Sequence, residues 1–382
     1  MKYTMKVTFP HMGNMYIPIK VLLETMGIDY AMPPLCNKKT LEYGVVHSPE
    51  FACLPFKTIL GDFIQGIENG ADYILFGGGC GQCRLGYYGD LQAEILKSLN
   101  YKVKFVNLDL SNMNFKNVVE KLKPFTEGKS VFSIVKGTIY AIKTVFAVDR
   151  LNNLANYTRC REVSRGETDK LMKLFHKKVQ KSKGYRGIHS VLKETRNALK
   201  KVKVDKDAKP LRVKMVGEIY TLIEPFVNLD IEKKLGNMGV EVCNEISISH
   251  WIKEHFIKNL FPFKREDKSH KAGREFMNTD DIGGHGLETI GSCVLSWKHG
   301  YDGVIQVYPF TCMPEIIAQS TFSTLQEKYP IPIMTLVVDE MTGQGGYMTR
   351  IEAFVDMLKK SKEAKEGSRI KKQFVPQTHA SK

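Results

Sequence analysis

Strand-like and helix-like segments alternate along the first part of the chain, and this alternation constrains the fold more than any other feature. Short apolar runs are each followed by a segment long enough for several helical turns. The expected strands are KVTFPHM, IDYAMPP, ADYILFGGG and YKVKFVNLDL, and the expected helices are MYIPIKVLLETMG, LPFKTILGDFIQGIENG and YYGDLQAEILKSLN. Strands that alternate with helices of this length predict a mostly parallel, doubly wound sheet.

A similar series returns after a region that reads as helix after helix. It begins at LRVKMVGEIYTLIEP and continues through the expected strands YDGVIQVYPF and IPIMTLVVD, each followed by an expected helix. We therefore predict an α/β protein with two similar lobes and a helical insert. The expected boundaries are 1–125 for the first lobe, 126–210 for the lysine-rich helical region, 211–358 for the second lobe and 359–382 for a basic tail.

The chain of 382 residues carries a formal net charge of +15. Much of the excess lies at 173–214 and in the terminal tail, with few aromatic residues interleaved for base stacking. This distribution disfavours nucleic-acid binding. It indicates a solvated lysine-rich face, or else a surface that docks an acidic partner or a phosphorylated ligand.

The N-terminal residues do not read as a secretory signal, and no apolar run approaches the roughly 18 residues that span a bilayer. We therefore predict a cytoplasmic protein without a membrane segment. In a reducing compartment its eight cysteines are expected to be thiols, metal ligands or catalytic groups rather than structural disulfides.

Four cysteines fall where an expected strand ends or an expected helix begins. Cys53 and Cys312 each lie two residues before a proline that can open a helix, and Cys80 and Cys83 follow a strand and a glycine run. Ligands bind at the carboxyl ends of parallel strands, and helix N-termini stabilise anions. We therefore expect these positions to lower the thiol pKa values and to prepare the thiols as metal ligands.

Several chemistries could use such thiols. A redox dithiol fits Cys80 and Cys83 but leaves Cys53 and Cys312 unexplained. A structural zinc site usually needs a second close pair of ligands, and the chain has none. The glycine run lacks the nucleotide-binding pattern and the P-loop lysine. An iron–sulfur cluster, which glycines allow the backbone to approach closely, is the favoured interpretation.

Three stretches, at 48–92, 281–291 and 303–358, resemble the family of 2-hydroxyacyl-CoA dehydratase components and their activase-associated relatives. The resemblance implies two Rossmann-like lobes with parallel sheets flanking a cluster cleft. It implies that Cys53 and Cys83 from the first lobe and Cys312 from the second lobe hold an iron–sulfur cluster, of the 4Fe–4S type.

The chain departs from a simple three-ligand pattern. Some members of the wider family hold a double-cubane 8Fe–9S cluster, which needs six thiolates, and this chain has further cysteines near the expected site. Cys80 and Cys36 are candidate ligands of this kind, with Cys36 equally readable as a bystander. The second lobe adds Cys243, which reads more readily as a buried strand residue, and Cys293. Cys160 in the helical region is expected to be a bystander.

The resemblance also implies a function. A separate ATP-hydrolysing activator with its own iron–sulfur cluster would reduce the protein, which would then dehydrate a 2-hydroxyacyl-CoA or reduce another small molecule by one-electron chemistry. A homodimer, or a heterodimer with a related subunit, is expected. A non-catalytic electron-transfer or cluster-scaffold protein is the alternative, and no catalytic residue is assigned.

Other polar residues follow expected strands. His285 in DIGGHGLETIG could wrap a cluster or phosphate, or could simply complete a turn. Glu218 and Glu224 could supply polar groups to the cleft or cap the next helix, together with Asn228. Glu340, Thr342 and Arg350 surround a glycine turn, where the arginine could face an anion or brace a carboxylate.

Overall fold

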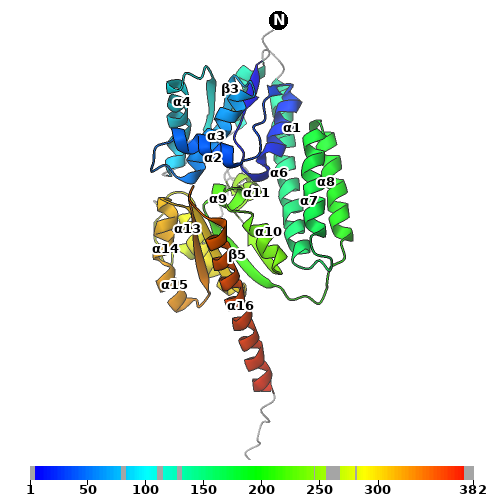
Figure 1. Cartoon of the computed structure of the whole chain (residues 1–382), viewed down its shortest axis with the longest axis vertical. Helices are drawn as coiled ribbons and strands as arrows, with labels where there is room; N and C mark the ends of the chain where they lie inside the picture. Colours follow the sequence, from blue (N-terminus) through cyan, green and yellow to red (C-terminus); the bar gives the residue numbers. More distant parts are fainter. Residues whose placement is uncertain are drawn as a thin grey trace, which may run out of the picture.

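The computed structural model describes residues 5–78, 83–109, 115–126, 131–244, 246–254, 267–279 and 282–373. It is an α/β protein with two four-stranded, all-parallel sheets flanked by helices, which confirms the predicted fold class. Figure 1 shows the first lobe above the second, with a group of long helices beside them.

The first sheet has the strand order β2-β1-β3-β4. Its strands are β1 (Lys6–Thr8), β2 (Asp29–Tyr30), β3 (Tyr73–Gly78) and β4 (Lys104–Asp109). Its helices are α1 (Tyr16–Met26), α2 (Lys38–His47), α3 (Leu54–Glu68) and α4 (Tyr88–Ser98), with the 3-10 turns η1 (Gly13–Met15) and η2 (Arg84–Tyr87).

Helices α2 and α3 approach each other unusually closely. A Cβ atom at Gly44 would lie 1.8 Å from the carbonyl oxygen of Lys57, and one at Gly61 would lie 1.9 Å from that of Thr40. Glycine is therefore required at both positions, because any larger residue would push the two helices apart. The close contact fixes α3, whose N-terminus carries Cys53.

The second sheet repeats the arrangement of the first, with the order β6-β5-β7-β8. Its strands are β5 (Leu211–Gly217), β6 (Val240–Asn244), β7 (Gly303–Pro309) and β8 (Ile333–Val338). Its helices are α9 (Ile219–Ile223), α10 (Ile231–Asn237), α11 (Ile248–Ile252), α12 (Lys268–Gly273), α13 (Gly286–Lys298), α14 (Met313–Ser320), α15 (Phe322–Lys328) and α16 (Gln344–Gln373).

Between the sheets the chain forms α5 (Phe115–Leu122), η3 (Lys123–Thr126), α6 (Val131–Arg159), α7 (Glu167–Lys181) and α8 (Gly184–Lys201). By length and composition alone, α6 is long and apolar enough to cross a membrane. The prediction that no segment approaches this criterion was therefore wrong. In the structure α6 packs against α1 and α8, and Ile134, Val148 and Leu151 are buried in the core that they share. Val131, Phe132 and Ile139 of α6 are exposed, so this packing accounts for only part of the apolar composition of the helix.

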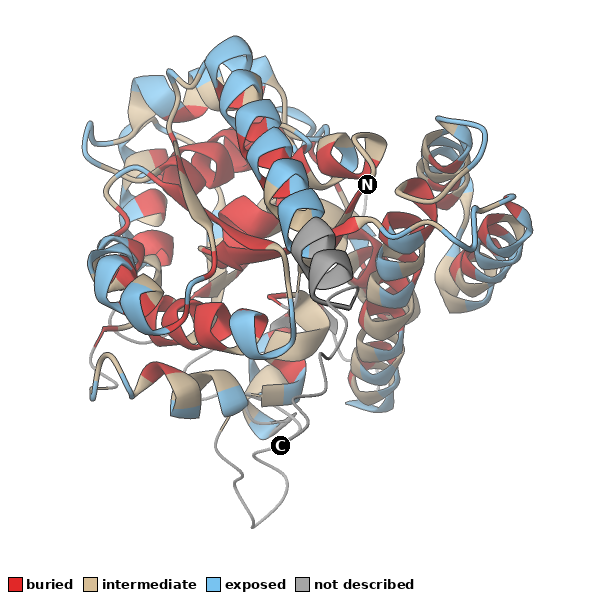
Figure 2. Cartoon of the chain, turned by 90° about the horizontal axis from the view of Figure 1, so that it is seen from below, coloured by how far each residue is buried: buried red, intermediate tan, exposed pale blue. Residues whose placement is uncertain are grey.

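The carboxyl ends of the two sheets face each other. Gly13 follows the first strand of the first lobe, and Glu224 follows the first strand of the second lobe. The Gly13 amide donates to Glu224 Oε2 at 2.8 Å. In the same way, Arg84 follows the third strand of the first lobe and contacts Thr311, which follows the third strand of the second lobe. Buried residues of both lobes also belong to one continuous core, and Figure 2 shows them concentrated in the strands and on the inner faces of the helices. Because ligands bind at the carboxyl ends of parallel strands, this interface between the lobes is where a site is expected.

Candidate metal centre

Three of the predicted ligands occupy N-cap positions of helical segments at the interface between the lobes. Cys53 is the N-cap of α3, Cys83 is the N-cap of η2, and Cys312 is the N-cap of α14. The prolines that follow Cys53 and Cys312 lie in the first turn of their helices, where the missing N–H costs nothing. The predicted helix starts at Cys53 and Cys312 are thus confirmed.

The Arg84 side chain ties together the three loops that carry these cysteines. Its Nη2 atom donates to the carbonyl oxygen of Thr311 at 2.8 Å and to the Thr311 hydroxyl at 2.9 Å. Its Nη1 atom donates to the carbonyl oxygen of Phe51 at 3.4 Å. Arg84 is adjacent to Cys83, Thr311 is adjacent to Cys312, and Phe51 lies two residues before Cys53. One guanidinium group therefore holds all three loops in place.

Thr311 itself has an unusual backbone conformation. Its φ angle is +69°, a region that non-glycine residues with branched side chains rarely adopt. Strained residues of this kind cluster at functional sites, where the surrounding structure holds them. At this position the Arg84 contacts supply that restraint and set the direction in which the chain enters α14.

Glu218 lies close enough to all three thiols to influence their ionisation electrostatically. Its side chain caps α9 by accepting the amides of Tyr220 at 2.9 Å and Thr221 at 2.8 Å. The helix-capping alternative for Glu218 is therefore observed.

The pKa values of the three thiols are shifted in the direction opposite to the one expected at helix N-termini. Burial, together with weaker effects such as the Glu218 charge, raises the pKa of Cys53 to about 11. Burial also raises the pKa values of Cys83 and Cys312, again with Glu218 contributing. The predicted lowering was wrong, because desolvation of a buried sulfur outweighs the favourable dipole at a helix N-terminus. Without a bound cation these thiols are protonated at neutral pH.

A buried tyrosine accompanies Cys53. The Tyr88 hydroxyl is in contact with the Cys53 sulfur, and the Tyr88 ring packs edge-on against Phe56 with 4.8 Å between centroids. Tyr88 is buried, so the contact excludes water from one side of this sulfur. Neither Tyr88 nor Arg84 was predicted from the sequence, although each lies within five residues of Cys83.

A second carboxyl group, that of Glu315, lies close to Cys312. Glu315 on α14 is buried and accepts hydrogen bonds from Gln306 at 2.9 Å and from Thr289 at 3.1 Å. Burial raises the pKa of Glu315 to about 7, against the opposing effect of these hydrogen bonds. No sequence signal identified this residue, because its burial depends on how α14 packs against β7 and α13.

Cys36 lies in a different environment from the three thiols. Its sulfur is 3.7 Å from both carboxylate oxygens of Asp62 and 4.0 Å from the Tyr220 hydroxyl. Asp62 is fully buried and accepts the His11 amide at 2.8 Å. Burial, followed by the charges of Asp62 and Glu224, raises the pKa of the Cys36 thiol. The structure therefore places Cys36 with a group of buried carboxyls.

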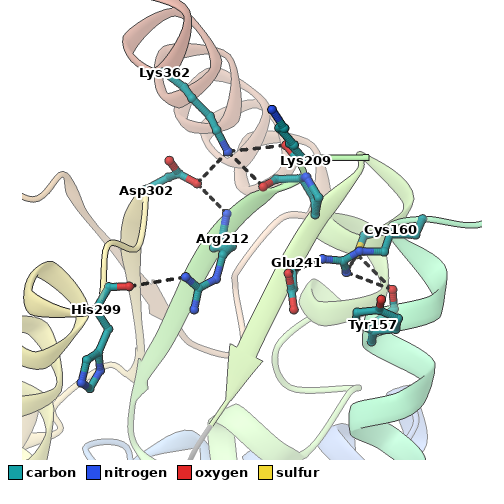
Figure 3. A network of polar contacts seen from close by, with 10 residues as sticks. Tyr157, Cys160, Lys209, Arg212, Glu241, His299, Asp302 and Lys362 are labelled. Carbon is teal, nitrogen blue, oxygen red and sulfur yellow. Dashed lines mark hydrogen bonds and ion pairs between the residues drawn. The ribbon is translucent and has the colours of Figure 1, made fainter. Parts of the chain in front are cut away.

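The remaining cysteines occupy other places. Cys80 lies outside the described residues. Cys243 is half-buried on β6, and Cys293 is fully buried on α13 within a hydrophobic cluster. Cys160 belongs to a polar network on the helical region, where Arg161 bridges to Glu241 at 2.7 Å (Figure 3).

The other polar residues singled out in the sequence mainly brace the fold. Arg350 donates to the carbonyl oxygen of Thr335 at 2.7 Å, and the Thr342 hydroxyl donates to Asp339 at 2.8 Å. Glu340 forms an ion pair with Lys57 of the first lobe, which joins the two lobes. Asn228 donates to backbone carbonyls of α9.

The three thiols have the donor chemistry of an iron–sulfur cluster. Among the described residues, they do not form a set of three donor atoms that all lie within 4.8 Å of one another. The cysteine ligands of a cluster bind several irons, which allows a wider spacing. Soft thiolates next to backbone amides at helix starts are also the donors that iron–sulfur clusters use. The residues present therefore fit such a cluster.

No protein-family model matches the chain, and no curated protein matches it.

Proposed function

We propose that this chain is an iron–sulfur protein of the 2-hydroxyacyl-CoA dehydratase type. The observation that carries the proposal is the meeting of Cys53, Cys83 and Cys312 at the interface between the lobes, held together by Arg84. These three thiolates would hold a 4Fe–4S cluster, and Cys80 is a candidate further ligand. When bound, the cluster would store and deliver single electrons at low potential.

The protein's own residues supply the surroundings of the cluster. Burial raises the thiol pKa values, so cluster binding must release protons from Cys53, Cys83 and Cys312. Tyr88 shields one sulfur from water. Glu218 adds a negative charge beside the thiolates, and negative charge near a cluster lowers its reduction potential.

In the proposed reaction a separate ATP-hydrolysing activator, carrying its own iron–sulfur cluster, reduces this protein. The reduced protein then dehydrates an acyl-CoA substrate or reduces a small molecule in one-electron steps. We propose a cytoplasmic protein that acts as a homodimer, or as a heterodimer with a related subunit.

Metal analysis tests the cluster directly. Protein purified without oxygen should be brown and contain at least about four irons and four acid-labile sulfides per chain. About eight irons would indicate the double-cubane form, which would require ligands beyond the three thiols. Zinc in place of iron, without sulfide, would contradict the proposal.

A further inference from the structure

A second group of metal-ligating side chains lies in the second lobe. His250, Glu254 and Asp267 each present a donor atom, and these three atoms lie within 4.8 Å of one another. All three residues are partly buried. None of them belongs to the thiol site, so metal binding by this group would be independent of the proposed iron–sulfur function.

Local structure positions all three donors. His250 and Glu254 are four residues apart on the helical turns that begin with α11, which places them on one face. The Ser249 amide donates to Asp149 of α6 at 2.9 Å and anchors the start of α11. Asp267 is the N-cap of α12, where its Oδ1 atom accepts the Ser269 amide at 2.7 Å. Capping uses one oxygen of Asp267 and leaves the carboxylate with a second oxygen as a potential ligand.

Two more histidines and a third carboxylate surround these donors. Glu288 on α13 lies 3.6 Å from Nε2 of His270 and 3.6 Å from Nε2 of His285. Glu288 is also close enough to His250, and Asp267 to His270, for their charges to interact. Glu288 therefore places a third carboxylate beside the donor group, where negative charge favours a bound cation.

The scaffold under this group is rigid. Helices α12 and α13 touch through glycines: a Cβ atom at Gly291 would lie 1.7 Å from the carbonyl oxygen of Ser269, and one at Gly273 would lie 2.5 Å from that of Leu287. Such close backbone contact fixes Asp267 and His270 relative to Glu288. A preorganised set of donors is what a metal site requires.

We propose that His250, Glu254 and Asp267 bind a divalent transition-metal ion, with the Glu288 carboxylate beside them favouring the bound cation electrostatically. One nitrogen and two oxygen donors suit zinc, manganese or ferrous iron. Three protein ligands leave a position open for water or another small ligand, as in catalytic zinc sites. A divalent cation would also add positive charge beside the three carboxylates gathered here.

Zinc titration of the full-length, anaerobically purified protein tests this site. Isothermal titration calorimetry should reveal one zinc site per chain. Glu254→Gln and Asp267→Ser should each weaken the zinc affinity by about 100-fold or more. Losing a group that only orients a ligand costs roughly 10-fold to 100-fold in affinity, so a larger loss indicates a ligand. Serine at 267 can still cap α12, so this variant removes a ligand while keeping the helix start. Glu288→Gln should weaken zinc binding by a smaller factor.

Two controls separate this site from others. His299→Gln alters an exposed histidine and should leave zinc binding unchanged. Cys53→Ser, which alters the thiol site, should also leave this zinc site intact. Zinc binding that is equal in wild type, Glu254→Gln and Asp267→Ser, or that disappears with Cys53→Ser alone, would overturn the proposal. So would the absence of zinc binding, which would make the group an ion-pair network.

Discussion

At the residue scale, the thiol assignment leads to a direct prediction. Replacing Cys53, Cys83 or Cys312 by serine should remove most of the bound iron, because a hydroxyl is a poor substitute for thiolate on iron. Iron and sulfide analysis of each anaerobic variant measures the loss. Cys160→Ser is the matched control, since Cys160 lies beside Arg161, away from the interface between the lobes, and should retain all the iron. Full iron content in the three ligand variants would contradict the assignment.

The buried carboxyl group of Asp62, beside Cys36, leads to a second prediction. Burial raises the pKa of Asp62 well above its usual range, so the folded protein keeps a proton that the unfolded chain releases from about pH 4 upward. The free energy of unfolding should therefore fall with rising pH, by at most about 1.4 kcal/mol per pH unit from this group, until the folded-state pKa is passed. In Asp62→Asn this part of the slope should disappear, so the stability of the variant relative to wild type should increase with pH.

Denaturant unfolding at a series of pH values measures this effect. Asparagine can still accept the His11 amide that Asp62 binds. Burial also raises the pKa of Glu224, so a smaller slope should remain in the variant. The exposed Asp356 is the control, and Asp356→Asn should follow the wild-type pH dependence. Parallel curves for wild type and Asp62→Asn would show that the Asp62 carboxyl does not titrate as inferred.

At the scale of elements, the contact between α2 and α3 should be sensitive to a single methyl group. In Gly44→Ala the new Cβ atom would meet the backbone of Lys57 at 1.8 Å, so the helices must separate. We expect a loss of about 1–3 kcal/mol in the free energy of unfolding. Because α3 carries Cys53, iron content should fall as well.

Gly187→Ala on α8 is the matched control for Gly44→Ala. There the new Cβ atom would meet only the Cβ of Ser182 at 3.7 Å, an ordinary contact. Alanine should stabilise this helix slightly, by up to about 1 kcal/mol. Equal unfolding free energies for the two variants in urea would contradict the role assigned to the contact between α2 and α3.

At the scale of the whole molecule, the proposed activator should dock near the helix starts at Cys53 and Cys83, because electron transfer needs the two clusters close together. A dimeric activator would match a two-fold symmetric pair of these chains. Stopped-flow reduction by a candidate activator should therefore require ATP. Rapid reduction without ATP would instead support the alternative of a simple electron-transfer protein.

The lysine-rich helices offer a related test of steering. If they attract an acidic activator, reduction should slow as salt rises, because the Debye length is only about 8–10 Å at physiological ionic strength. Charge reversal of exposed lysines on α8, Lys193→Glu and Lys200→Glu, should slow reduction at low salt, whereas Lys360→Glu on α16 should not. Reduction that is independent of salt would show that these lysines form a solvated surface with no role in steering.

Local sequence determined the elements of this protein. The alternation of strands and helices predicted both parallel sheets, and prolines placed the helix starts at Cys53 and Cys312. These features depend on residues a few positions apart, so they can be read along the chain. The helical character of α6 was predicted, but its apolar length was not recognised, because Lys136 and Lys143 interrupt its run of apolar residues.

Only the tertiary structure decided how the candidate sites are composed. It joined Arg84 to Thr311 across the lobes, set Cys36 beside Asp62, and gathered His250, Glu254 and Asp267 around one point. It also reversed the expected shift of the thiol pKa values, because desolvation depends on everything that packs around a sulfur, whereas the helix dipole depends on the local chain alone. Contacts between residues far apart in sequence leave no periodic signal, so folding alone reveals them.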